Sequence, residues 1–254
     1  MRTRVAVQGF AAGFILLFAH AGSAQAPAIR VLASNGIREV IESLKPQCEG
    51  AAGHPLAMQY GSTTELLQTM AKDGQFDVAI LTTEGIDELI KEGKIAQGSR
   101  VEIARAGIGV GVRSGAPKPD IGTADALKQT LLKAKSITYA KDGASRVYLE
   151  KMFDRLGIGA DLKPKIILEQ GSGGAGKRVA SGGADLVMTL ASEILPMPGV
   201  QYVGPLPAQL QSYVSFAAGV SAKAANAEAG KAMIKFLASP AAAPALKPKG
   251  MEPR

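Results

Sequence analysis

The sequence contains a single cysteine, Cys48, and only two histidines, His20 and His54. A lone cysteine forms neither a disulfide framework nor a cysteine-based metal cluster. Catalytic triads, zinc sites and most general-base schemes need histidine, and His54 precedes Pro55 in an expected loop, where a surface role is the simpler interpretation. We therefore expect no catalytic residue, no metal, no cofactor and no enzymatic activity.

Long hydrophobic runs are also scarce, and the one that stands out lies at the N-terminus. Two basic residues, Arg2 and Arg4, lie near the start of the chain. An apolar run then extends over residues 5–18, and small residues follow as far as Ala26. This order is typical of a secretory signal peptide, and the run is shorter than the roughly 20 residues that span a bilayer. We expect cleavage near Ala26 and a mature protein in the periplasm.

Positive charges exceed negative charges only modestly in this sequence. The chain has 29 Lys and Arg against 22 Asp and Glu, with a formal net charge of +7. A positive excess suits an anionic ligand, but the sequence has no dense basic block interleaved with aromatic residues, so we expect no nucleic-acid partner.

Short apolar runs alternate with amphipathic segments along the mature chain. This alternation predicts an α/β protein with a mostly parallel sheet and helices on its faces. The expected strands cover residues 29–33, 56–60, 76–81, 101–105, 108–113, 136–139, 166–169, 186–190, 200–203 and 212–220. The expected helices cover residues 37–44, 65–72, 84–94, 124–132, 146–156, 228–237 and 240–246, and one more ends at residue 180 after a glycine-rich joint.

The order of these elements predicts two lobes. After the signal peptide at 1–26, residues 27–106 and 206–254 form lobe I, and residues 107–205 form lobe II. The chain then crosses twice between the lobes, at Ala106-Gly107 and again near residue 206. Two crossing segments favour hinge closure over a ligand.

At four places an expected strand runs into a helix through small polar residues, at 34–36, 61–64, 143–145 and 171–176. The first N–H groups of a helix lack partners and carry partial positive charge, so such a joint can hold an anion without a charged side chain. We expect the four joints to meet in one small-anion pocket.

The glycine-rich joint satisfies G-x-G-x-x-G and nearly satisfies the nucleoside-triphosphate loop motif. Arg178, however, stands where that loop needs Ser or Thr, and only Glu193 lies near the position of the acid that binds a dinucleotide ribose. We therefore expect either backbone N–H groups close to a small anion or a flexible loop, and no nucleotide site.

Arginines begin two of the expected helices. Arg146 and Arg38 lie in first turns, where a basic side chain opposes the helix dipole unless a negative group is near. We predict that Arg146 contacts the ligand and that Arg38 is solvated, although the sequence leaves open whether Arg38 reaches the cleft. An arginine–carboxylate contact contributes about 1.5–3 kcal/mol.

Five stretches of the sequence, residues 29–34, 60–66, 76–81, 147–148 and 233–240, resemble the periplasmic molybdate-binding proteins of ABC importers. The resemblance extends over essentially all of the mature chain. It implies the type 2 periplasmic binding-protein fold, with two doubly wound α/β lobes joined by two hinge crossings, and a role in transport.

The resemblance also implies how the ligand is held. In that family, serine hydroxyls and N–H groups of the first two joints hold an oxyanion, with backbone at the later joints and a tyrosine after a later strand. Thr63, beside Ser62, matches the second-joint serine, but Gly36 occupies the first-joint serine position and Leu190 replaces the tyrosine. An arginine such as Arg146 is also foreign to that pocket, so the ligand stays open between a molybdate-like oxyanion and a small organic carboxylate.

We predict a periplasmic substrate-binding protein that captures a small anion between two lobes and delivers it to an inner-membrane ABC permease, acting as a monomer. The predicted ligand-binding residues are Ser34, Asn35, Gly36, Ser62, Thr63, Ser145, Arg146 and Ser172. Two alternatives remain: a periplasmic receptor that presents its ligand to a signalling partner, and a secreted enzyme that uses His54 or the glycine-rich segment.

Overall fold

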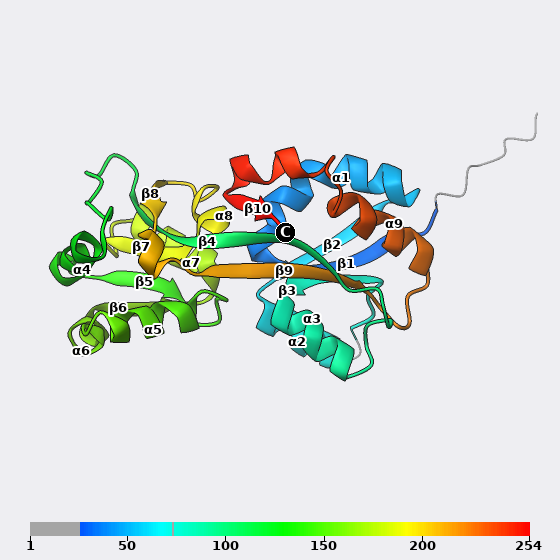
Figure 1. Ribbon diagram of the computed structural model, residues 1–254, viewed down its shortest axis with the longest axis horizontal. Coiled ribbons are helices and arrows are strands. Elements are labelled where there is room, and N and C mark those ends of the chain that lie inside the picture. The colour runs from blue at the N-terminus through cyan, green and yellow to red at the C-terminus, as the bar shows by residue number, and fades with distance from the viewer. Residues whose placement is uncertain (1–25, 73) are drawn as a thin grey trace, which may run out of the picture.

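The computed structural model describes residues 26–72 and 74–254. The predicted signal peptide lies outside the described residues, apart from Ala26. Two lobes lie side by side along the long axis of the molecule, and the long strands β4 (Val101–Arg113) and β9 (Tyr213–Val220) run across the join (Figure 1). From one edge to the other, the strands lie in the order β2 (Leu56–Gly61), β1 (Ile29–Ser34), β3 (Val78–Thr82), β9, β4, β7 (Leu186–Leu190), β5 (Ile137–Ala140) and β6 (Ile166–Glu169).

Lobe I holds the first three βα units of the chain. Its strands are β1 (Ile29–Ser34), β2 (Leu56–Gly61) and β3 (Val78–Thr82), with β1 parallel to both neighbours and β9 antiparallel to β3. The helices α1 (Arg38–Ala52) and α9 (Ala227–Leu237) cover one face of the sheet, and α2 (Thr63–Ala71) and α3 (Thr83–Lys91) cover the other (Figure 1). Since both faces are covered, β3 is buried along its whole length, as expected for a parallel strand.

Lobe II repeats this plan around β4. Its strands are β5 (Ile137–Ala140), β6 (Ile166–Glu169), β7 (Leu186–Leu190) and β8 (Val200–Pro205), of which β5 runs parallel to both β6 and β7. Its helices are α4 (Ala124–Lys133), α5 (Arg146–Arg155), α6 (Gly159–Leu162), α7 (Gly171–Ala180) and α8 (Ala191–Ile194). The predicted fold class is thus confirmed, whereas the exact lobe boundaries stay a prediction.

The first crossing between the lobes is made by the continuous strand β4, so the prediction of two strands separated by Ala106-Gly107 is wrong. Ala106 and Gly107 stay in register with Val214 and Tyr213 of β9. The partners of β4 change beyond this point, where Ile108 begins to pair with β7. The Gln211 side chain bonds both the N–H and the carbonyl of Ile108, at 2.9 and 3.0 Å, so the backbone stays satisfied through the change.

Two other predicted elements differ from the structure. The first helix continues past Pro46 to Ala52, because its buried face continues through Cys48 and Ala52; that packing outweighs the cost of about 3 kcal/mol that an interior proline brings. The predicted helix at 240–246 is replaced by the short 3₁₀ turns η4 (Ala243–Ala245) and η5 (Lys247–Lys249), which lead into β10 (Met251–Pro253) against β4. No helix in residues 26–72 and 74–254 is long and apolar enough to cross a membrane.

Candidate functional site: a cavity between the lobes

All four predicted joints meet at one cavity of about 20 Å³. The carboxyl ends of β1 and β2 in lobe I and of β5, β6 and β7 in lobe II supply its walls. The lining residues are Ser34, Asn35, Gly36, Ser62, Thr63, Ala140, Asp142, Gly143, Ala144, Gly171, Ser172, Leu190 and Glu193. The structure therefore brings Ser34, Asn35, Gly36, Ser62, Thr63 and Ser172 together, and their contact with a ligand stays a prediction.

The second joint is the most regular of the four. Ser62 caps α2 by accepting the Glu65 N–H at 3.1 Å, and the Glu65 carboxylate accepts the Ser62 N–H at 3.0 Å. This reciprocal capping box fixes the direction in which α2 leaves the strand. Helix α2 begins at Thr63, two residues earlier than predicted, and the Thr63 hydroxyl accepts the Thr82 N–H at 3.3 Å.

The first joint has no room for a side chain at position 36. A Cβ atom on Gly36 would lie 2.5 Å from Phe216 Cζ and 3.0 Å from Leu190 Cδ1. Gly36 and Leu190 are the two positions that depart from the molybdate-binding pattern, and they face each other across the lobes. Leu190 and Phe216 therefore leave no room at position 36 for the serine that the resemblance to molybdate-binding proteins implies.

Asp142 links the third joint to the fourth. Its Oδ1 atom accepts the Gly171 N–H at 3.3 Å, and its Oδ2 atom is buried without a hydrogen-bond partner among the described residues. Gly171 itself has a φ of +66°, a conformation that favours glycine.

The glycine-rich segment is helical, so the flexible-loop interpretation is wrong. Helix α7 begins at Gly171 and includes Gly173, Gly174 and Gly176. A Cβ on Gly176 would lie 2.7 Å from Met197 Sδ, so this glycine allows close packing inside lobe II. The helix start places its first N–H groups beside the cavity, as a small-anion site requires.

Glu193, like Asp142, is an ionisable residue of the cavity lining that was not among the predicted ligand-binding residues. It comes from α8, a single turn that begins directly after β7. The Ser172 hydroxyl donates to Glu193 Oε1 at 3.0 Å, and the Thr189 hydroxyl bonds the other carboxyl oxygen. Burial raises the pKa of Glu193, the hydrogen bonds from Thr189, Ser172 and the Leu190 backbone lower it, and the nearby charge of Asp142 raises it further. A fifth strand-to-helix junction after residue 190 was the sequence signal for this residue.

The structure does not place the other two predicted site residues on the cavity lining. Ser145 is buried behind it, with its hydroxyl 3.4 Å from Thr189 Oγ1. Arg146 turns to the outside of lobe II, where it donates to Glu150 at 2.7 Å and to the Lys141 carbonyl at 2.8 Å. The negative group that compensates its helix position is therefore Glu150, one turn along α5.

Arg38 and Tyr60 form a separate pair at the edge of lobe I. The Arg38 guanidinium lies 4.8 Å from the centre of the Tyr60 ring, and the Tyr60 hydroxyl donates to Glu42 at 2.7 Å. Neither residue lines the cavity. His54 is also remote from it, since its Nδ1 atom lies 2.9 Å from the Pro27 carbonyl oxygen.

Two hydrogen bonds cross between the lobes beside the cavity. The Ser192 hydroxyl donates to the Gly36 carbonyl at 2.7 Å, and the Gln170 amide donates to Glu65 at 3.1 Å. Both bonds join segments that flank the joints, so they hold the two walls of the cavity close together.

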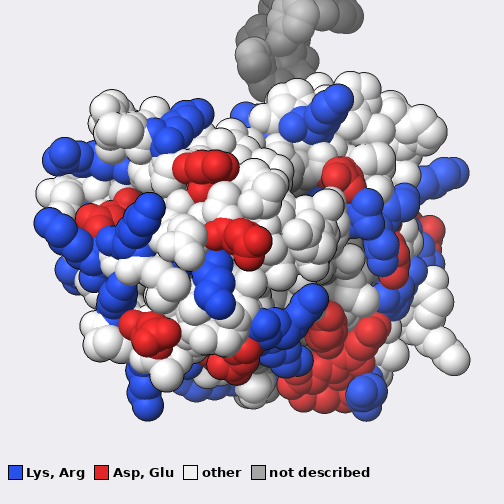
Figure 2. All heavy atoms as spheres, turned by 60° about the vertical axis from the view of Figure 1, so that its left-hand side comes forward, with Lys and Arg blue, Asp and Glu red and all other residues white. Residues whose placement is uncertain are grey.

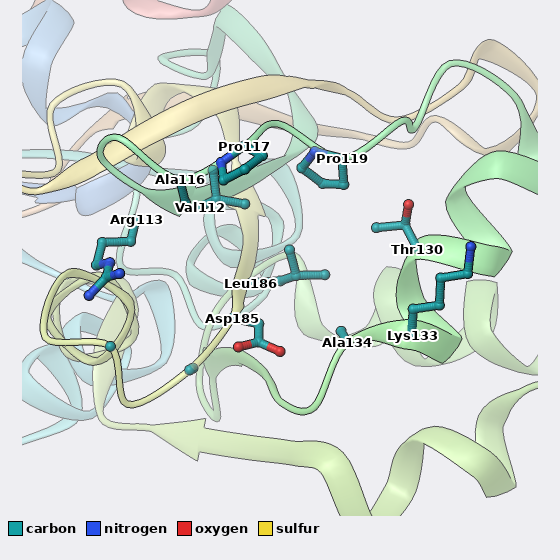
Figure 3. A pocket seen from close by; sticks show the side chains of 12 residues that line it. Val112, Arg113, Ala116, Pro117, Pro119, Thr130, Lys133, Ala134, Asp185 and Leu186 are labelled. Carbon is teal, nitrogen blue, oxygen red and sulfur yellow. The ribbon is translucent and has the colours of Figure 1, made fainter.

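Larger hollows occur elsewhere on the molecule. One of about 420 Å³ lies at the amino ends of β5 and β7, opposite the joints, with Arg113 at one end, Lys133 at the other and Asp185 between them (Figure 3). Asp185 accepts the Lys135 N–H at 2.7 Å, so it has a structural role there. Figure 2 shows basic and acidic side chains mixed across this end of the molecule. In the described part of the chain, no three His, Cys, Asp or Glu side chains form a group that could hold a metal ion.

Comparison with known proteins identifies the family. A family model described as bacterial extracellular solute-binding protein matches residues 29–252. The chain belongs to this family. An aconitate isomerase from Pseudomonas sp. is 35% identical over 231 residues, which cover 89% of this chain and 87% of that protein.

Solved structures of solute-binding proteins share the fold. The periplasmic molybdate-binding protein of Azotobacter vinelandii has a TM-score of 0.74 and 18% identity, with 88% of this chain and 98% of that chain covered. A sulfate-binding protein of Mycobacterium tuberculosis has a TM-score of 0.72 and 19% identity, with 89% of this chain and 86% of that chain covered. The predicted resemblance is thus confirmed for family and fold, and the solute-binding class is confirmed with it.

Proposed function

We propose that this solute-binding protein captures a small anion between its lobes and delivers it to an ABC permease in the inner membrane. The observation that carries the proposal is the convergence of four strand-to-helix joints on one cavity at the boundary between the lobes. Polar hydroxyl and amide groups and helix N-termini from both lobes face the same point, and such groups hold anions without a basic side chain.

The size of the cavity supports capture by hinge closure. A volume of about 20 Å³ holds roughly one water molecule. An oxyanion or a small carboxylate is larger, so the lobes must move apart for it to enter. The strands β4 and β9 and the Gln211 contact to Ile108 form the connection about which that movement occurs. The permease then distinguishes the closed, loaded form from the open one.

The lining favours a small organic carboxylate over molybdate. The apolar contact between Gly36 and Leu190 removes hydroxyl groups that the molybdate pattern uses. The related aconitate isomerase carries the name of an organic acid. Arg146 cannot supply the affinity from its position on the outside of α5, so we assign that role to the joints themselves.

A thermal-shift panel tests this function. The probes are molybdate, sulfate, phosphate, acetate, succinate, citrate and trans-aconitate, applied to the mature chain and to two variants. Ser34→Ala removes a hydroxyl that lines the cavity, and Ser43→Ala removes an exposed one from the outside of α1. We expect one carboxylate to stabilise the protein and Ser34→Ala alone to weaken its binding by about 10-fold or more, since a hydrogen bond to a charged group contributes about 1.5–3 kcal/mol. Stabilisation by none of the anions would reject the proposed function.

A second candidate function is isomerisation of an unsaturated carboxylate. It is favoured by the 35% identical aconitate isomerase and by the carboxyl groups of Glu193 and Asp142 at the cavity. A 1,3-proton shift needs a group that removes a proton from a CH₂ carbon next to the double bond and returns one to the far end of that bond, with no net change in protons or electrons. A carboxyl group beside the ligand can perform both transfers.

Proton NMR of trans-aconitate in deuterated buffer separates the two functions. Conversion to the cis isomer, with solvent deuterium at the former vinylic CH carbon that becomes the new CH₂ position, would establish the isomerase, and Glu193→Gln should then abolish turnover. Binding of trans-aconitate without conversion would reject the isomerase and support solute capture as the only one of the two functions.

A further inference from the structure

Glu193 places an acidic side chain in a cavity that we assign to an anion. The residue is partly buried, and in the described part of the chain no Lys, Arg or His side chain lines this cavity. An ionised Glu193 would therefore repel the ligand at close range with no positive side chain to offset it. Asp142, on the same lining, would add to the repulsion.

We propose that Glu193 meets the bound anion as a neutral carboxylic acid, so that the cleft takes up its anion together with one proton held on this side chain. The inference rests on the proposed function, which it deepens by defining the charge that the site accepts. The proton comes from solvent when the anion binds and returns to solvent when the anion leaves.

The hydrogen bonds around Glu193 permit this change of state. Its two side-chain partners, Ser172 and Thr189, are hydroxyl groups, which can donate to a carboxylate or accept from a carboxylic acid. The Leu190 backbone group is a third partner, and it can donate to the carbonyl oxygen of the neutral acid as well as to the carboxylate. Each hydroxyl can turn when the proton arrives, and neither needs to be replaced. A lysine or arginine partner would instead have fixed Glu193 in its ionised form.

The basic side chain of Lys247 lies near α8, but it lines a separate hollow behind this helix and not the cavity that Glu193 lines. From lobe I, the cavity receives the neutral side chains of Ser34, Asn35, Ser62 and Thr63. Behind α8, Tyr202 and Lys247 line a separate hollow with Ala191 and Leu195, and burial raises the pKa of Tyr202 to about 12, so that it is neutral. Asp142 is the one other ionisable group on the cavity lining of the described residues.

The arrangement sets the direction of the pH dependence. Burial already raises the pKa of Glu193 in the free protein, and a neighbouring anion raises it further. At pH values between the pKa of Glu193 in the free protein and its higher pKa in the anion complex, binding takes up a proton. In this range the affinity for the anion falls as pH rises, by up to tenfold per pH unit. Below both values, and above both values, affinity is independent of the state of Glu193.

Calorimetric titration in buffers of different ionisation enthalpy counts the protons directly. The probes are trans-aconitate and molybdate, applied to the mature chain at several values from about pH 5 to about pH 8. Carboxyl groups with pKa near 4 are ionised over most of this range, so trans-aconitate itself contributes little above about pH 6. We expect uptake approaching one proton per bound anion within this range.

Three variants, Glu193→Gln, Asp142→Asn and Glu150→Gln, assign that proton. Glu193→Gln keeps a neutral hydrogen-bonding side chain, and it should bind without proton uptake and with affinity nearly independent of pH. Glu150→Gln, on the outside of α5 beside Arg146, is the matched control and should retain the uptake.

The outcomes against the inference are distinct. No proton uptake by the wild-type protein at any pH tested, with anion binding intact, would overturn it. Uptake that is lost in Asp142→Asn but retained in Glu193→Gln would overturn it by moving the proton to Asp142. Failure of both probes and of every anion in the thermal-shift panel to bind would instead reject the proposed function.

Discussion

Replacing Gly36 by alanine tests how closely the walls of the cavity approach each other. The added Cβ would lie 2.5 Å from Phe216 Cζ and 3.0 Å from Leu190 Cδ1. Phe216 is fully buried on β9 and Leu190 is 2% exposed at the end of β7, so neither side chain can turn into solvent. The structure must therefore either absorb the strain or move the lobes apart.

The expected cost has two parts. Overpacking of a filled site costs about 1–3 kcal/mol, which for a chain of this size lowers the melting temperature by about 2–4 °C for each kcal/mol. The contact with Leu190 also opposes closure, so the alanine variant should bind the stabilising anion more weakly than the wild-type protein does. Every 1.4 kcal/mol or so of strain confined to the closed form lowers the affinity about tenfold.

The assay compares thermal unfolding and anion affinity of Gly36→Ala with those of Gly50→Ala. Gly50 lies within α1, and a Cβ added there would meet nothing within 4 Å. Alanine is the better helix former by about 1 kcal/mol, so the control should be as stable as the wild-type protein or more stable. A Gly36→Ala variant with unchanged melting temperature and unchanged affinity would refute the close approach of Phe216 and Leu190 to the first joint.

The remaining predictions concern capping, burial and Arg146. Ser62→Ala should lower the free energy of unfolding by about 1 kcal/mol in urea denaturation, because it breaks the capping box with Glu65. A loss of less than a few tenths of a kcal/mol in the free energy of unfolding would contradict this. Burial raises the pKa of the Cys48 thiol to about 12, so at pH 8 a thiol reagent should label it only after unfolding, and rapid labelling of the native protein would be the contrary result. Arg146→Ala should leave anion affinity unchanged in calorimetry, because Arg146 is paired with Glu150 outside the cavity; a tenfold loss would restore it to the site.

Much of the architecture could be predicted from sequence periodicity alone. The bounds of β6 and β7 agree with the prediction, because both strands are short apolar runs with clear polar ends. The predicted helix at 124–132 is α4, which Thr123 caps by accepting the Ala126 N–H at 3.1 Å. The positions of the joints follow from these same local signals, and they meet because the carboxyl ends of parallel strands share one edge of a sheet.

The features that sequence reasoning missed depend on contacts distant in the chain. The unbroken path of β4 through Gly107 is fixed by pairing with Tyr213, more than a hundred residues away. The direction of Arg146 depends on Glu150 and on the Lys141 carbonyl, which compete with any ligand for its guanidinium. Glu193 reads as an ordinary surface residue of a short helix until the fold places Ser172 beside it.

The two departures from the molybdate-binding pattern have a common cause that the linear sequence hides. Gly36 and Leu190 were separate anomalies, one in the first joint and one after β7. In the folded chain the Leu190 side chain, together with Phe216, fills the space where a side chain at position 36 would lie, so the two departures belong to one apolar arrangement. This arrangement changes the expected ligand more than either substitution would alone.

A crystal structure of the mature chain grown with the anion that stabilises it most would test the central claim directly. We predict density for that anion between Ser34, Thr63, Gly143 and Gly171, with both lobes in contact with it. Density for the anion in the hollow beside Arg113 and Lys133, with the cavity between the lobes free of it, would contradict the account.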